Sequence, residues 1–260
     1  MLRSIGFLVR LALVTIGVHF ISEGLQSEAA IASPKESEFC EGRLRDGWLN
    51  GRHACRFPGG NRFEGEFRNN VRQGRGVFTF ADGTRCEGEF QNNLLNGRGV
   101  CTFPSGNRYE GEFRNNVRQG RGTFIYRDGT RCEGNFQGDR LTGNGRCTFR
   151  SGNVYEGSFQ NNVRQGRGVM TYANGIRCEG TFRNNVLTGA GVCVYPNGDR
   201  YEGEFQNNQR HGRGTYIFAN NQRSQGTWRN GRLVQSQTPR NQINRVNRRT
   251  NRAAPVRRRR

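Results

Sequence analysis

The sequence has few apolar side chains for its length. Hydrophobic residues make up 32% of the 260 positions, which is a low fraction for a globular protein of this size, while 38 positions are glycine. This shortage excludes a thick core buried between two layers. It favours a repeat array in which each unit buries a small apolar surface against its neighbours.

No apolar run is long enough to cross a bilayer as a helix, which takes about 20 residues. The most apolar stretch, residues 11–21, is preceded by Arg3 and Arg10 and followed by the small-x-small pattern Ala30-Ile31-Ala32. These features are typical of a cleaved export signal over residues 1–32, so we expect a secreted or periplasmic protein. The alternative is a retained N-terminal anchor in residues 7–21, with the chain facing away from the cytoplasm.

The residue patterns of catalytic and metal sites are missing as well. Beyond residue 32 the only histidines are His53 and His211, far apart in the chain, and there is no Cys-x-x-Cys. Gly-x-Gly strings such as residues 74–76 lie in predicted strands and precede no helix, so they are not nucleotide-binding loops. We therefore expect no enzyme activity, no cofactor and no bound metal.

What the sequence does contain is a 23-residue repeat. A strict period over eight copies means that the repeat is itself the unit of the fold. After a short polar linker, residues 33–39, the array covers residues 40–233 and includes a ninth, partial copy from residue 224. Position 1 of the eight full copies is Cys40, Phe63, Cys86, Tyr109, Cys132, Tyr155, Cys178 and Tyr201.

Each repeat has the pattern of one β-hairpin. Positions 1–5 alternate between apolar and polar residues, which indicates a strand with one apolar face. Positions 6–11 contain Asn-Asn and other turn formers, so we expect a loop there, and positions 12–18 form the second strand. Asp-Gly or Asn-Gly dipeptides, such as Asp82-Gly83, close the unit with a turn.

The cysteines occupy positions 1 and 16 of the odd-numbered repeats only. The even repeats have other residues, mostly aromatic, at both positions, so the two positions are expected to touch. Cysteines two repeats apart would be separated by about 19 Å at the usual strand spacing, too far for a disulfide. Disulfides persist in oxidising compartments, whereas reduced thiols are the alternative. The predicted pairs are Cys40–Cys55, Cys86–Cys101, Cys132–Cys147 and Cys178–Cys193.

If position 1 faces position 16, the rest of the register follows. Positions 3 and 14, both mostly glycine, then face each other and leave a flat gap where aromatic rings can lie. Position 5 faces position 12, and on the other face position 4 meets position 13. The Glu at position 2 is expected to pair with an Arg two residues earlier, as in Arg62 and Glu64. The ion pairs expected across positions 4 and 13 are Glu66–Arg75, Glu89–Arg98, Glu112–Arg121 and Glu204–Arg213.

The repeat resembles a known family. The segment Tyr109-Glu-Gly-Glu-Phe113, followed by Asn115, Gly120-x-Gly122 and Asp128-Gly129, is similar to the MORN repeat. The resemblance implies an all-β fold, a single-layer, elongated and twisted antiparallel sheet of consecutive hairpins. Two features depart from the family: Asn-Asn stands where Asn-Gly is usual, and Cys replaces the aromatic residue in alternate units. The second suggests a doubled 46-residue unit adapted for export.

Basic residues are in surplus, with a formal net charge of +20. Residues 234–260 contain no acidic residue, so we expect a disordered, Arg-rich tail. The even repeats also carry Arg at position 10, in the predicted loop, where the odd repeats have Leu. Such arginines could dock an anionic surface, although a merely solvated edge is the alternative. The candidates are Arg72, Arg118, Arg164, Arg210, Arg257, Arg258, Arg259 and Arg260.

Two functions fit these features. The first is a non-catalytic exported scaffold whose rigid repeat surface binds another protein or a second copy of itself. An aromatic face that a single-layer sheet leaves exposed at Phe67, Phe90, Phe113 and Phe205 would support it. The second is an envelope tether that binds anionic lipid or polymer through the loop and tail arginines. Nucleic acid is a less favoured partner, because export and the lack of a stacking module argue against it.

The mature protein should contain no free thiol. Mass spectrometry after alkylation, with and without reductant, should show eight modified cysteines only after reduction. Peptide mapping should place each bridge within one repeat. A peptide that links cysteines of different repeats would contradict the predicted register.

Overall fold

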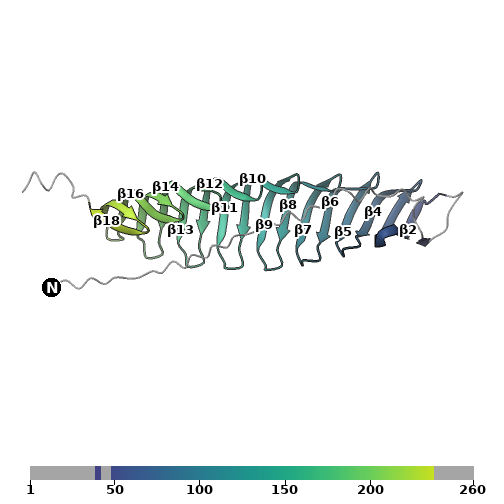
Figure 1. The fold of residues 1–260 in the computed structure, drawn as a ribbon, viewed down its shortest axis with the longest axis horizontal. Helices are drawn as coiled ribbons and strands as arrows, with labels where there is room; N and C mark the ends of the chain where they lie inside the picture. The colour runs from purple at the N-terminus through teal and green to yellow at the C-terminus, as the bar shows by residue number, and fades with distance from the viewer. Residues whose placement is uncertain (1–38, 42–47, 237–260) are drawn as a thin grey trace, which may run out of the picture.

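The protein forms one open β-sheet. The computed structural model describes residues 39–41 and 48–236, which contain 18 strands. Each strand pairs antiparallel with its neighbours in sequence, so the expected all-β array of consecutive hairpins is confirmed. Figure 1 shows the hairpins side by side along an elongated molecule. The predicted signal 1–32 lies outside the described residues, as does the predicted tail 234–260 except for its first three residues, which lie in the last strand.

From the second repeat to the eighth, the strands alternate between seven and nine residues in length. A short 3-10 turn, η2 (Pro58–Gly60), replaces part of the loop after the first repeat. The strands are β1 (Phe39–Glu41), β2 (Gly51–Arg56), β3 (Arg62–Arg68), β4 (Val71–Thr79), β5 (Arg85–Gln91), β6 (Leu94–Thr102), β7 (Arg108–Arg114), β8 (Val117–Ile125), β9 (Arg131–Gln137), β10 (Arg140–Thr148), β11 (Val154–Gln160), β12 (Val163–Thr171), β13 (Arg177–Arg183), β14 (Val186–Val194), β15 (Arg200–Gln206), β16 (Gln209–Ile217), β17 (Arg223–Arg229) and β18 (Arg232–Ser236).

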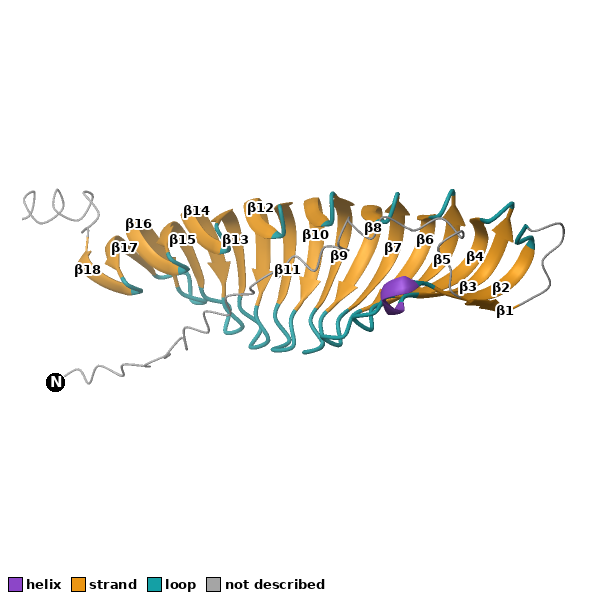
Figure 2. Cartoon of the chain, turned by 45° about the vertical axis from the view of Figure 1, so that its right-hand side comes forward, coloured by secondary structure: helices purple, strands orange, loops and turns teal. Residues whose placement is uncertain are grey.

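From the second repeat onward, two residues connect the two strands of each repeat. Asn69 and Asn70 both have positive φ, 49° and 64°, which is the backbone of a tight turn whose twist matches that of a hairpin. Asparagine tolerates this left-handed region better than most non-glycine residues. The predicted loop over positions 6–11 is therefore wrong, because the strands continue to position 6 and resume at position 9. Figure 2 shows these short turns along one long edge of the sheet.

Five-residue loops connect successive repeats along the opposite edge (Figure 2). After β4 the Gly83 N–H donates to the Phe80 carbonyl at 2.9 Å, and Gly83 has a φ of 91°. The Thr84 N–H donates to Asp82 Oδ1 at 2.7 Å. The predicted Asp-Gly turns are thus confirmed, and they join one hairpin to the next.

A bulge in the second strand sets the register within each repeat. Phe63 faces Phe78 and Gly65 faces Gly76, so positions 1 and 3 pair as predicted. Position 5 faces position 10 rather than position 12, because the second strand holds two extra residues at positions 12 and 13. Glycine at position 12 permits this, as in Gly74, whose φ is 84°.

The bulge also changes the partner of position 13. Arg75 faces Glu89 and Arg98 faces Glu112, so position 13 lies opposite position 4 of the next repeat. The pairing of positions 12 and 13 with positions 5 and 4, which was expected within one repeat, instead joins each repeat to the next. The predicted pairs within one repeat are therefore wrong: Glu66–Arg75, Glu89–Arg98, Glu112–Arg121 and Glu204–Arg213 do not face each other.

The glycines at positions 3 and 14 let an aromatic ring lie flat on the sheet, as predicted. A Cβ atom on Gly122 would clash with the Tyr109 ring. In this orientation the Tyr109 hydroxyl donates to the Glu112 carbonyl at 3.2 Å, and the ring meets Phe113 edge-on with centroids 5.1 Å apart. The ring therefore fills the space above the glycine pair.

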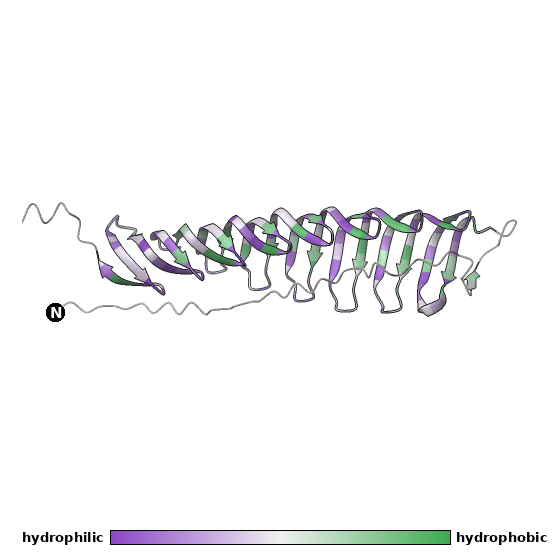
Figure 3. Cartoon of the chain, turned by 45° about the horizontal axis from the view of Figure 1, so that its top comes forward, coloured by the Kyte–Doolittle hydropathy of each residue, from purple (hydrophilic) through white to green (hydrophobic). Residues whose placement is uncertain are grey.

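The aromatic face is buried even though the sheet has a single layer. Phe63 packs edge-on against Phe67 of its own repeat and Phe90 of the next, with centroids 5.3 and 4.9 Å apart. A ring at position 1 is thus covered by aromatic rings of its own repeat and of the next. The expectation of exposed aromatics is wrong, and Figure 3 shows hydrophobic and hydrophilic residues alternating along the strands. Phe67, Phe90, Phe113 and Phe205 are at most 4% exposed.

The second residue of the turn, Asn in most repeats, ties its repeat to the preceding one. The Asn93 N–H donates to the Arg72 carbonyl at 3.1 Å, and Asn93 Oδ1 accepts from the Arg72 N–H at 2.9 Å. The same two bonds join Asn116 to Leu95 and Asn162 to Leu141. Glycine at this position would supply only the first bond, which gives the Asn-Asn turn a structural reason.

The Gly122→Ala substitution should lower the free energy of unfolding by about 2 kcal/mol, because the added methyl group displaces the Tyr109 ring from the sheet. Urea unfolding followed by circular dichroism would measure the change. Thr123→Ala, at the next position on the opposite face, should cost much less. Equal losses for the two variants would contradict the role of the glycine pair.

Candidate interaction surface

The four disulfides lie on the apolar face and join the predicted pairs. In each odd repeat the cysteines of positions 1 and 16 face each other, with Cα atoms 4.0 to 4.1 Å apart. They take the place of aromatic pairs such as Phe63 and Phe78 in the even repeats. No cysteine among the described residues is free. The bridges are Cys40–Cys55, Cys86–Cys101, Cys132–Cys147 and Cys178–Cys193.

The position-10 arginines also lie on this face. Arg72 and Arg118 are 2% and 3% exposed, and Arg164 and Arg210 are half-buried. The solvated edge that the sequence left as the alternative to anionic binding is not formed, because the bulge places position 10 opposite the buried aromatic residue of position 5. Arg257–Arg260 lie outside the described residues, so their part in anionic binding stays a prediction.

Each of these guanidinium groups is held among three aromatic rings. The Arg72 guanidinium carbon lies 5.0 to 5.5 Å from the centroids of Phe57, Phe63 and Phe78. Such cation–π contacts offset part of the cost of removing the charge from water. Burial lowers the pKa of the Arg72 guanidinium, and its Nε atom has no hydrogen-bond partner.

The same arginines contact position 8 of the following repeat. Arg72 Nη2 donates to the Asn93 carbonyl at 3.2 Å, and Arg118 Nε forms an ion pair with Asp139 at 3.0 Å. Arg210 Nη2 donates to the Gly231 carbonyl at 2.6 Å. These residues therefore connect repeats to one another, and Arg72 and Arg118 are almost entirely shielded from solvent.

On the polar face, the Glu at position 2 pairs with the Arg two residues earlier, as predicted. Both partners are exposed, so each pair contributes at most about 1 kcal/mol to stability. The pairs neutralise one row of charge along the sheet. They are Arg62–Glu64, Arg85–Glu87, Arg108–Glu110, Arg131–Glu133, Arg177–Glu179 and Arg200–Glu202.

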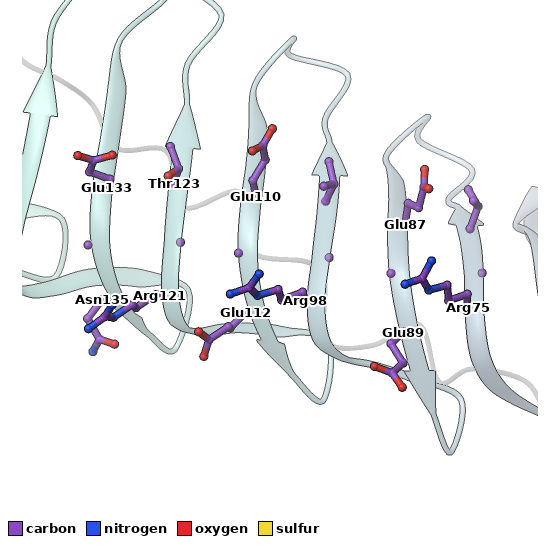
Figure 4. Close-up of a pocket in the computed structure, with 18 of the residues that line it drawn as sticks. Arg75, Glu87, Glu89, Arg98, Glu110, Glu112, Arg121, Thr123, Glu133 and Asn135 are labelled. Carbon is purple, nitrogen blue, oxygen red and sulfur yellow. The ribbon is translucent and has the colours of Figure 1, made fainter.

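A groove of about 1410 Å³ runs across the polar face from the first to the fifth repeat. Its floor is the line of glycines at positions 3 and 14, including Gly88, Gly99 and Gly111. Figure 4 shows side chains in two rows on either side of this line. Glu87, Glu110 and Glu133 stand in one row, and Arg75, Glu89, Arg98, Glu112 and Arg121 stand in the other.

The second row is a ladder of alternating charge, whose residues sequence reasoning named but paired within each repeat. One charged side chain comes from each of six consecutive strands, β3 to β8, and all six are exposed. None of them makes an ion pair or a side-chain hydrogen bond with the described part of the chain. We call this set the charge ladder: Glu66, Arg75, Glu89, Arg98, Glu112 and Arg121.

The charge ladder is confined to the N-terminal half of the array. Before it, Arg52 is already engaged with Glu64 at 3.5 Å. After it, the neighbouring strands carry Asn135 and Asn144 at the same positions. An isolated pair, Glu204 and Arg213, recurs near the C-terminal end. The sequence signal for the charge ladder is Glu at position 4 and Arg at position 13 in three successive repeats. It can be recognised only when position 13 of one repeat is paired with position 4 of the next.

The groove is lined mainly by charged side chains and glycine backbone. Within residues 39–41 and 48–236 no three or more His, Cys, Asp or Glu residues gather as metal ligands. In the same part of the chain no helix has the length and apolarity to pass through a membrane. The titratable groups that line the groove are carboxylates and guanidinium groups, which attract groups of opposite charge.

The comparison with protein families agrees with this architecture. The MORN repeat family matches seven successive segments, residues 63–85, 86–108, 109–131, 132–154, 155–177, 178–200 and 201–223. They span β3 to the start of β17 and contain the whole charge ladder. No curated protein sequence matches the chain.

Several solved structures are similar in shape. The TCP10 domain of CPAP from Danio rerio is 14% identical, with a TM-score of 0.43, over 76% of this chain and 93% of that one. The G-box domain of CPAP is 13% identical, with a TM-score of 0.45, over 73% and 99%. The SAS-4 TCP domain of Drosophila melanogaster is 12% identical, with a TM-score of 0.38, over 59% and 84%. Likenesses at this level indicate no function for the chain.

Leucine at position 72 should be tolerated, because leucine already occupies position 10 in the odd repeats. We expect Arg72→Leu to change the free energy of unfolding by no more than about 1 kcal/mol, since it removes a desolvated charge. Arg118→Leu should lower it by about 1 to 3 kcal/mol, because Asp139 then loses its ion pair.

Urea midpoints of the oxidised protein would measure both changes. Adding Asp139→Asn to Arg118→Leu recreates the Leu and Asn combination of the odd repeats and should recover most of the loss. A double variant as unstable as Arg118→Leu alone would show that the ion pair is not the cause.

Proposed function

Because the chain belongs to the MORN repeat family, we propose that it is a non-catalytic scaffold whose rigid sheet presents the charge ladder to another protein or to a second copy of itself. Rigidity has three sources in the described residues: disulfides, asparagine bonds between repeats, and buried aromatic rings. A surface held in this way loses little conformational freedom when a partner binds.

The observation that carries the proposal is the set of unpaired charges on one face. Elsewhere on that face the Glu at position 2 is matched by an Arg of the same strand, as in Arg85 and Glu87. Members of the charge ladder face each other across neighbouring strands, as Arg75 and Glu89 do, but none of them forms an ion pair with the described residues. Groups of this kind add specificity and association rate when a complementary surface meets them.

The proposed place of action is an oxidising compartment outside the cytoplasm. Four disulfides support it, since they persist where thiols are not kept reduced. The signal predicted in residues 1–32 fits the same location, secreted or periplasmic. A retained N-terminal anchor would hold the array in that compartment at the membrane surface.

A second candidate function is an envelope tether that binds anionic lipid or polymer. The net charge of +20 favours it. The tether was expected to bind through the position-10 arginines and the Arg-rich tail. Because the position-10 arginines pack on the apolar face, the tail is the remaining support for it. We place it second, because the tether does not use the charge ladder.

Crosslinking in the producing cells would test the scaffold proposal. Lysine is almost absent from the sequence, so a photo-crosslinking residue at Thr123, which lines the groove, is preferable to an amine reagent. Thr215 occupies the same repeat position outside the groove and serves as the matched control site. We expect a protein adduct from position 123 and none from position 215.

The adduct should disappear when Arg75, Arg98 and Arg121 are replaced by serine, and should persist in Arg167→Ser, which lies outside the charge ladder. No adduct from position 123, or one that ignores the triple substitution, would refute the proposal. Flotation with anionic phospholipid vesicles that is lost after deletion of residues 237–260 would support the tether instead.

A further inference from the structure

The charge ladder is complementary to itself. Its six members occur in the order Glu66, Arg75, Glu89, Arg98, Glu112 and Arg121, one on each of the strands β3 to β8. We propose that two copies of this chain associate antiparallel through this row, about a two-fold axis centred between Glu89 and Arg98. The inference rests on the proposed scaffold function and names its partner.

The symmetry gives every charge an opposite partner. A two-fold axis at the centre of the row brings the first member against the last, the second against the fifth and the third against the fourth. Because signs alternate over an even number of strands, each of these contacts joins a carboxylate to a guanidinium group. The contacts are Glu66 with Arg121, Arg75 with Glu112, and Glu89 with Arg98 of the second copy, each formed twice.

The ends of the row fit this interpretation. Arg52, the next charge on one side, already pairs with Glu64, and Asn135, the next residue on the other side, is neutral. Neither end therefore leaves an unmatched charge against the second copy. Six strands at about 4.8 Å spacing give a row roughly 24 Å long, an extent that ordinary protein interfaces reach.

The groove provides room for the second copy. It runs beside the charge ladder over the glycine line, with Val77, Val100 and Thr123 along its other side. In an antiparallel pair about this axis, the two rows face each other directly and the two grooves face each other beside them. The longest side chains of each copy then reach the opposite charges of its neighbour.

A simple polyanion or polycation fits less well. The charge ladder contains three carboxylates and three guanidinium groups, so a ligand of one sign would meet as much repulsion as attraction. A fully complementary partner carries charges of alternating sign at the strand spacing, in the order opposite to that of the charge ladder. This chain has that pattern and spacing, because the second copy carries the same row.

The central contact should matter most. The sheet twists from strand to strand, so two antiparallel rows diverge on either side of the axis. Glu89 and Arg98 meet at that axis and contribute two contacts close together. Reversing the charge of either one replaces two attractions with two repulsions.

Sedimentation velocity of the oxidised full-length protein over a range of concentrations would test the inference. We expect wild type to form a dimer, and Arg98→Glu and Glu89→Arg to raise its dissociation constant by about tenfold or more, since each exposed pair changes affinity up to about fivefold. An equimolar mixture of the two variants should dimerise like wild type, because both central contacts then join opposite charges again.

Arg213→Glu is the matched control, since Arg213 has the same repeat position outside the charge ladder and should leave the dimer intact. Arg121→Glu, at the end of the row, should weaken it less than Arg98→Glu. The wild-type dimer should dissociate as salt is raised to about 0.5 M, where charges on the surface are largely screened.

A monomeric wild type, a dimer unaffected by Arg98→Glu, a mixture that fails to associate, or equal disruption by Arg213→Glu would overturn the inference. A monomer that still gives an adduct with a different protein from position 123 would leave the scaffold function standing and show that its partner is not a second copy. Loss of both dimer and adduct would refute the two together.

Discussion

The opposed glycines at positions 3 and 14 are the constraint on which the rest of the structure depends. With no Cβ atoms there, the ring at position 1 lies on the backbone, as Tyr109 lies on Gly122. The ring can then meet both the aromatic residue of its own repeat and that of the next, at 5.1 Å from Phe113 and 5.0 Å from Phe136. A single-layer sheet therefore buries its apolar face by contacts along the sheet, and no second layer is required.

The bulge beside these glycines has two effects, one on the apolar face and one on the polar face. It turns position 10 onto the apolar face, where Leu95 in an odd repeat and Arg118 in an even one fill the same place. It also displaces Arg98 from Glu89 of its own repeat and sets it opposite Glu112 of the next. The first effect uses basic residues to connect repeats inside the fold. The second leaves a row of exposed charges without partners in the described chain, which is the basis for the proposed scaffold and dimer.

The two halves of the doubled 46-residue unit fill positions 1 and 16 on the apolar face in different ways. Odd repeats close positions 1 and 16 with a disulfide and place a buried leucine at position 10, as Cys86, Cys101 and Leu95 do. Even repeats close them with aromatic rings and insert an arginine among those rings, as at Arg72. The covalent solution holds only in an oxidising compartment. The second relies on desolvated charge held by aromatic faces, so the two types of repeat should respond differently to reduction.

The sequence by itself determined the period, the hairpin, the cysteine partners and the pairing of Arg62 with Glu64, because each follows from local pattern and from the requirement that equivalent positions behave alike. It also determined that glycine lies under the aromatic rings. The tertiary structure alone decided the position of the bulge, since a strand with two extra residues has the same alternation as one without them. That choice buried Arg72, covered Phe67 and moved the partner of Arg75 from one repeat to the next. Register is a property of paired strands, so the surface that we propose for binding became visible only when the hairpins were placed side by side.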